Sequence, residues 1–260
     1  MLSNYAERSF THDGTTKPLH VRGAGPAVIV IHEIPGINPH VVRFADWVVD
    51  AGFSVYLPEL VGTAGRQPSL GYVLASIATI CISREFAVLA AHRSSPVTAW
   101  LRALVGHAHA DAGGTGVGAV GMCFSGNFVL AMMLEPGLLA PVLSQPSLPF
   151  PLGAERKKAL HLTPDELACV KQRCAAGAKV LGLRFKGDRA CPPERFATLR
   201  RELKSAFEGI EIDDKHANPR SRNPQPHAVL TADLIDRAGE PTREAANRVI
   251  AFLRERLTAA

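Results

Sequence analysis

The feature that most constrains the fold is a short stretch of small residues, 118–126, between two apolar segments. Residues 116–120 predict a buried strand, and residues 127–134 predict a helix. The turn between them carries one reactive side chain, Cys123, at its apex. This pattern is typical of a nucleophile elbow, in which a strained strand-to-helix turn exposes the nucleophile. A buried structural cysteine would fit the same local pattern, so the choice between a nucleophile and a structural thiol depends on the rest of the chain.

Other apolar runs predict a mostly parallel sheet. Residues 27–31 and 53–57 are continuous apolar segments, as expected for strands that are buried on both faces. Between them, Asn38 and Pro39 are a good N-cap and first residue for a helix that ends near Ala51. A strand, a helix and a strand joined by short connections are typical of a parallel α/β fold with helices on both faces.

The later elements continue this alternation. We expect strands at 139–143, 179–185 and 209–213, and helices that begin at Ser95, Thr163, Pro192 and Thr242. No linker is long enough to separate domains, which predicts a single domain over 1–260. Residues 60–94 lack clear caps and are a candidate segment for covering the site.

Composition and charge exclude several function classes. The net charge of +5 comes from scattered Lys and Arg without interleaved aromatic residues, which argues against a nucleic-acid partner. The 5 cysteines form no CxxC pair, and His107 and His109 lack a third ligand, so neither a disulfide framework nor a metal or other cofactor is expected. With no signal sequence and no apolar run of membrane-spanning length, we expect a soluble, cytoplasmic protein that binds no membrane.

Two further reactive residues follow later strands, and their order along the chain is informative. Asp188 comes directly after the strand at 179–185, and His227 follows the last expected strand. Nucleophile, acid and histidine is the chain order of α/β-hydrolases, and parallel sheets place their sites at the carboxyl ends of strands. In this interpretation His227 takes the thiol proton of Cys123 and Asp188 fixes the imidazole tautomer. The backbone N–H groups of Phe124 and Ile34 would hold the oxyanion.

Each of these residues has an ordinary alternative. Asp188 could be a turn aspartate, and His216 is a rival to His227 as the base. We prefer His227 because it directly precedes the apolar residues Ala-Val-Leu. Glu33 follows a fully apolar strand, which argues against a simple surface carboxylate, although it could be structural.

Taken together, these segments resemble the dienelactone hydrolase family of α/β-hydrolases from about Ala27 to Leu257. The resemblance is carried by residues 32–38 (His-Glu-Ile-Pro-Gly-Ile-Asn), 53–60, 121–126 (Gly-Met-Cys-Phe-Ser-Gly), the Asp188 turn and His227. It implies an α/β-hydrolase fold, a Cys-Asp-His triad, and a glutamate, here Glu33, that contacts the resting thiol and controls its ionisation. The implied reaction opens an unsaturated lactone by acyl transfer to cysteine and then to water.

The chain departs from the family pattern in two places. Ser125 replaces the first glycine of the usual closing Gly-Gly pair. No arginine lies between Ala228 and Leu234, where the family has one for the substrate carboxylate, and Arg84 is the candidate replacement. We therefore expect a hydrolase of a lactone or small ester that prefers neutral esters. The alternatives are a carboxylesterase or thioesterase without dienelactone preference, and a non-enzymatic or redox-sensing protein that uses Cys123. The oligomeric state stays open.

Overall fold

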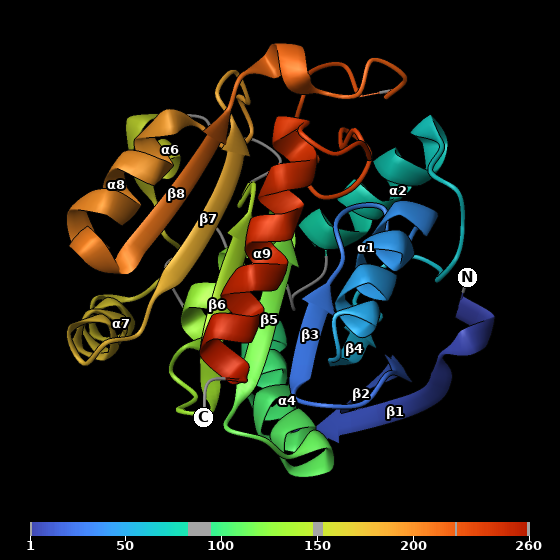
Figure 1. The fold of residues 1–260 in the computed structure, drawn as a ribbon, viewed down its shortest axis with the longest axis vertical. Coiled ribbons are helices and arrows are strands. Elements are labelled where there is room, and N and C mark those ends of the chain that lie inside the picture. Colours follow the sequence, from blue (N-terminus) through green and yellow to red (C-terminus); the bar gives the residue numbers. More distant parts are fainter. Residues whose placement is uncertain (1, 83–94, 148–152, 222, 259–260) are drawn as a thin grey trace.

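The computed structural model describes residues 2–82, 95–147, 153–221 and 223–258. Within them, the strands form one 8-stranded sheet in the order β1-β2-β4-β3-β5-β6-β7-β8 (Figure 1). The strands are β1 Ala6–His12, β2 Thr15–Arg22, β3 Ala27–Ile31, β4 Ser54–Pro58, β5 Val117–Met122, β6 Leu138–Ser144, β7 Val180–Phe185 and β8 Phe207–Ile212.

Only one edge of the described sheet is antiparallel. The β1–β2 hairpin pairs through β2 with β4, and from β4 to β8 every neighbouring pair is parallel. This mostly parallel sheet with helices is the α/β-hydrolase fold, as the sequence predicted. Its parallel strands bring their carboxyl ends to a common edge, where the loops that follow them can form a site.

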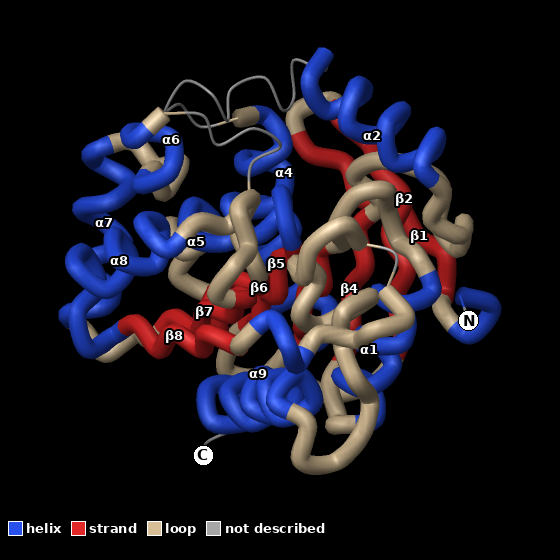
Figure 2. Tube along the Cα trace, turned by 90° about the horizontal axis from the view of Figure 1, so that it is seen from above, coloured by secondary structure: helices blue, strands red, loops and turns tan. Residues whose placement is uncertain are grey.

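Helices cover both faces of the sheet (Figure 2). In that view α1 and α9 lie on one face, and α4, α5, α7 and α8 lie on the other. The described α-helices are α1 Pro39–Asp50, α2 Leu70–Ile82, α4 Pro96–Ala112, α5 Phe128–Met132, α6 Ala154–Lys158, α7 Pro164–Ala175, α8 Pro193–Leu203 and α9 Pro241–Leu257.

The hydrophobic core is divided by the sheet. Along β3, Ile29 and Ile31 face a cluster built with α4 and α5, whereas Val28 and Val30 face a cluster built with α1 and α9. All five residues of β3 are buried, which explains why its sequence is continuously apolar rather than alternating.

The local start signals of two helices are confirmed. The Asn38 side chain accepts the N–H groups of His40 at 2.8 Å and Val41 at 3.2 Å, and so caps α1. Thr163 and Glu166 form the expected capping box of α7.

Two boundaries differ from the prediction. The segment after Cys123 begins as a 3₁₀ helix over Cys123–Asn127, and the α-helix is only the short α5. Phe207 opens β8 instead of ending α8, and its ring packs edge-to-face on Phe196 at a centroid distance of 5.4 Å. The short helix α6 was not anticipated.

Candidate active site

The turn at the end of β5 holds Cys123 in a strained backbone conformation. Its φ angle is 57°, in the left-handed region that non-glycine residues rarely adopt. Small neighbours make the turn sterically feasible. A Cβ on Gly121 would lie 2.6 Å from the carbonyl oxygen of Ser125, and one on Gly126 would lie 3.0 Å from Cα of Pro146. Strain of this kind is concentrated at functional sites.

Ser125 ties this turn to the neighbouring strand. Its hydroxyl accepts the N–H of Met122 at 2.8 Å and lies 3.0 Å from the carbonyl oxygen of Ile31 in β3. The side chain is completely buried. Serine therefore fits where the family has glycine, and it adds a polar link that the sequence pattern did not reveal.

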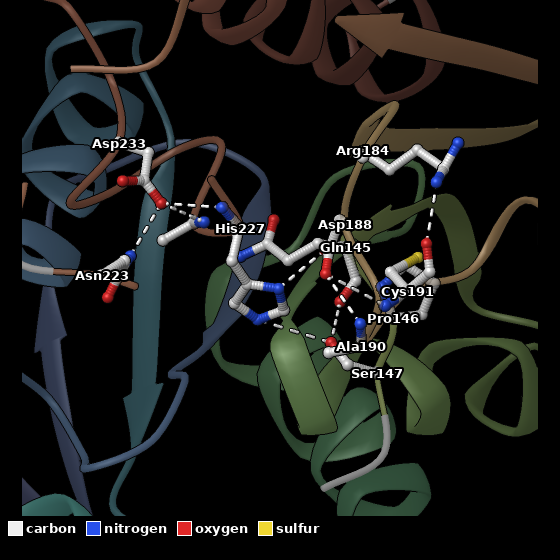
Figure 3. A network of polar contacts seen from close by, with 12 residues as sticks. Gln145, Pro146, Ser147, Arg184, Asp188, Ala190, Cys191, Asn223, His227 and Asp233 are labelled. Atoms are coloured by element: carbon white, nitrogen blue, oxygen red, sulfur yellow. Dashed lines mark hydrogen bonds and ion pairs between the residues drawn. The ribbon is translucent and has the colours of Figure 1, made fainter. Parts of the chain in front are cut away.

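Asp188 and His227 meet at the carboxyl edge of the sheet (Figure 3). Nδ1 of His227 donates to Oδ2 of Asp188 over 2.7 Å. The other carboxylate oxygen, Oδ1, accepts the N–H groups of Ala190 at 2.9 Å and Cys191 at 3.2 Å. Asp188 is thereby fixed in a fully buried position, and it fixes the imidazole with Nε2 directed away from the carboxylate.

The electrostatics around His227 favour its protonated form. Burial lowers the pKa of its imidazole, but the interaction with the Cys123 thiolate and the hydrogen bond to Asp188 raise it, so that this pKa lies well above 6.5. Cys123 is close enough to His227 to act on the ionisation of its imidazole. The structure thus brings Cys123, Asp188 and His227 together, whereas the rival His216 lines a separate groove beside β8.

Asp233 holds the loop that carries the histidine. Its Oδ2 accepts the N–H groups of His227 at 2.8 Å and Ala228 at 2.7 Å, and Nδ2 of Asn223 at 2.7 Å (Figure 3). Sequence reasoning missed this residue. The signal was a carboxylate inside the apolar segment 228–234, because a buried carboxylate requires donors.

The loop after β3 is organised by His32. Its Nδ1 lies 2.8 Å from the carbonyl oxygen of Glu33, and its Nε2 accepts the N–H of Leu60 at 3.0 Å. Because Nε2 is an acceptor, the ring is neutral, and burial lowers its pKa to about 4. His32 therefore joins the loops after β3 and β4 and has a structural role.

Glu33 is buried beside the site. Its carboxylate lies 3.5 Å from Nδ2 of Asn38. Burial raises its pKa, while Thr231, the charge of His227 and Asn38 lower it. The resemblance implies a contact with the resting thiol, and the carboxylate also interacts with the charge of His227.

A pocket of about 470 Å³ opens over these side chains. Glu33, Ile34, Cys123 and His227 all line it, whereas Phe124 is buried beneath the turn. Part of the proposed covering segment contributes Gln67, Pro68 and Val73. The loop before His227 contributes polar residues, Asn218, Arg220, Ser221 and Asn223.

Two arginines are candidates for contact with an anionic substrate, one named from the sequence and one that lines the pocket. Arg84 lies outside the described residues. Arg220, which is exposed and lines the pocket, was missed because its loop has no regular pattern in sequence.

The family profile of the dienelactone hydrolases matches residues 15–149, which is more than half of the 260 residues. The chain belongs to the dienelactone hydrolase family. The matched region includes the Glu33 loop and the Cys123 turn, but it ends before Asp188 and His227. Family membership identifies a hydrolase fold with this elbow, whereas the chemistry of the site depends on its own residues.

Three known proteins resemble this chain in sequence or in structure. A segment of 52 residues is 36% identical to YghX of Escherichia coli, a protein assigned as a hydrolase fragment, and spans 20% of this chain and 44% of YghX. A Klebsiella pneumoniae protein assigned as a dienelactone hydrolase superposes with a TM-score of 0.63 at 20% identity, covering 96% of this chain and 98% of that one. A dienelactone hydrolase-like promiscuous phosphotriesterase from metagenomic libraries has a TM-score of 0.62 at 16% identity, covering 97% and 98%. At these identities the likeness shows the fold alone.

No described helix combines the length and apolarity that crossing a membrane requires. In the same part of the chain, no group of three or more His, Cys, Asp or Glu side chains is arranged to hold a metal ion.

Proposed function

We propose that the protein hydrolyses a lactone or small carboxylic ester through a covalent acyl-cysteine intermediate on Cys123. The observation that carries this proposal is the junction of a positive-φ cysteine with a histidine that is oriented by a buried aspartate. A nucleophile, a base and a group that orients the base are the requirements of nucleophilic acyl transfer.

The expected reaction has two halves. In the first, Nε2 of His227 takes the thiol proton, and the sulfur attacks the substrate carbonyl carbon. The N–H groups of Ile34 and Phe124 would stabilise the oxyanion as it forms. The C–O bond then breaks and His227 returns the proton to the leaving alkoxide, which leaves a thioester on Cys123. The alcohol departs when the substrate is an ester and stays attached to the acyl group when it is a lactone. In the second half, His227 takes a proton from water as the water oxygen attacks the thioester carbon. The C–S bond then breaks, the acid is released, and His227 returns the proton to the sulfur of Cys123.

Turnover of p-nitrophenyl acetate tests the proposal. We expect ester hydrolysis by the wild-type protein, acetylation of Cys123 detectable by mass spectrometry, and loss of both in Cys123→Ala. Cys174→Ala is the matched control, because Cys174 lies on α7, outside the pocket, and should leave turnover unchanged. Turnover that survives Cys123→Ala would rule out this nucleophile. Absence of turnover together with rapid peroxide oxidation of Cys123 would favour the redox-sensing alternative.

A further inference from the structure

A short loop after β6 approaches His227 from the side opposite to Asp233 (Figure 3). It contains Gln145, whose φ of 35° places a buried non-glycine residue in the left-handed region. The N–H of Gln145 donates to the carbonyl oxygen of Leu183 in β7 over 2.7 Å, and the N–H of Ser147 donates to the carbonyl oxygen of Cys123 over 3.1 Å. The loop is therefore fixed both to the strand before Asp188 and to the cysteine turn.

The Ser147 hydroxyl is a donor to one neighbour and faces another with its oxygen. It donates its proton to the carbonyl oxygen of Gln145 over 2.5 Å, and its oxygen lies 3.5 Å from Nε2 of His227. Because the much shorter contact uses the only hydroxyl proton, the oxygen presents lone pairs to the imidazole. A neutral His227 that donates from Nδ1 to Asp188 has a lone pair on Nε2 as well. Two lone pairs repel each other, whereas an Nε2–H would find an acceptor.

We propose that Ser147 is a positioning residue that favours the protonated state of His227 by accepting from Nε2. This inference rests on the proposed Cys123–His227 pair and extends it to a fourth side chain. Ser147 is 2% exposed and does not line the pocket, so it acts through the imidazole and not on the substrate.

The proton balance shows when this acceptor matters. When the thiol proton moves to Nε2, the S–H bond breaks and an N–H bond forms, while the Ser147 proton stays on its own oxygen. Once the sulfur has bonded to the acyl carbon, it no longer carries the negative charge that attracted Nε2–H. Ser147 then accepts from Nε2 until the leaving group takes the proton. A long contact in the unliganded protein is compatible with this role, because catalytic hydrogen bonds commonly tighten only in the reacting complex.

Other charged groups act on His227 and stay constant in the test. Asp188 contacts Nδ1 from the loop after β7, Cys123 faces it from the turn after β5, and Glu33 acts on it from the loop after β3. Asp233 bonds the backbone N–H of His227. Variants of Ser147 alter none of these groups, so a change in the ionisation of the pair can be assigned to the hydroxyl.

The test measures alkylation of Cys123 by iodoacetamide across pH, quantified on the peptide that contains Cys123. Loss of the hydroxyl should lower the imidazole pKa and weaken the thiolate–imidazolium pair. We expect the neutral-pH rate of Ser147→Ala to fall roughly three- to tenfold, as for loss of a hydrogen bond of ordinary strength. The midpoint of its profile should move to higher pH, and its rate should reach that of the wild type once the thiol ionises unaided.

Matched variants separate this role from a packing defect. Ser147→Thr keeps a hydroxyl and Ser147→Val has the same shape without one, so only the Val variant should shift the profile. Ser144→Ala is the second control, because the buried Ser144 hydroxyl bonds the Gln145 side chain and not His227. Superimposable profiles for the Thr and Val variants, or an equal shift in Ser144→Ala, would overturn the proposal. Alkylation requires no turnover, so a wild-type protein inactive on esters would refute the proposed function and leave this result interpretable.

Discussion

The backbone N–H of His227 lies 2.8 Å from Oδ2 of Asp233, which fixes the histidine loop from behind. Asp233 is 1% exposed and receives two further donors at the same oxygen. His227 is therefore held at two points. Asp188 fixes its imidazole ring, and Asp233 fixes its backbone.

We expect Asp233→Asn to lower both the stability of the protein and its rate of ester hydrolysis. An amide oxygen accepts less strongly than a carboxylate, which should lower the free energy of unfolding by about 2 kcal/mol. The freed loop should lower kcat more than it changes KM. Urea unfolding and ester kinetics measure both effects. Asp236→Asn, at a half-exposed aspartate of the same segment that pairs with Arg243, is the control. Equal losses in the two variants would argue against this anchoring role.

The hydroxyl of Ser125 should stabilise the cysteine turn. Ser125→Ala removes the acceptor for the N–H of Met122 and the link to Ile31, while the Cβ stays in place. We expect the free energy of unfolding to fall by about 1–3 kcal/mol, because a buried donor is left without its partner. Thermal unfolding provides the measurement. An unchanged melting temperature would mean that the turn is held by its glycine contacts alone.

The charge of Glu33 should support the imidazolium. Burial raises the pKa of Glu33, so its charge appears only as the pH rises, and once present it attracts the proton of His227. The Glu33→Gln variant should therefore be alkylated at Cys123 at the wild-type rate at acidic pH. Above neutral pH its alkylation rate should be about threefold lower than that of the wild type. Faster alkylation in the variant would instead show that Glu33 suppresses the thiolate, as the family resemblance implies.

His32 should make the protein sensitive to acid. Burial lowers its pKa from 6.5 to about 4 in the folded state. Between these values the unfolded chain binds a proton that the folded protein does not, so stability falls as the pH falls. The full effect is about 3 kcal/mol. Urea unfolding between pH 7 and 4 should show this loss, and His32→Gln should lack this part of the slope. His12→Gln, near the surface, should retain it.

The sequence was sufficient for the fold because burial on both faces leaves a direct signature. The apolar run 27–31 has few alternatives to a central strand, and Asn38 and Thr163 mark helix starts through local hydrogen bonds. Within the site, the predictable residues were those that directly follow strands in the chain order expected of the fold. Ser147 was not predictable, because the approach of its loop to His227 depends on the tertiary structure. Asp233 was missed although its partners lie in its own segment, because that segment has no regular pattern.

Arg220 should set the tolerance for anionic substrates. It lines the pocket and is exposed, so its attraction for a substrate carboxylate is screened by salt. We expect Arg220→Gln to lower kcat/KM for dienelactone by about threefold at low ionic strength, with a smaller effect at high salt. Hydrolysis of p-nitrophenyl acetate, which carries no charge, should be unchanged and should remain the faster reaction in both proteins. Arg189→Gln is the matched control, since Arg189 is an exposed arginine that lines a different groove. Two results would contradict this role: a loss equal for both substrates, or a dienelactone rate above that of the neutral ester in the Gln variant.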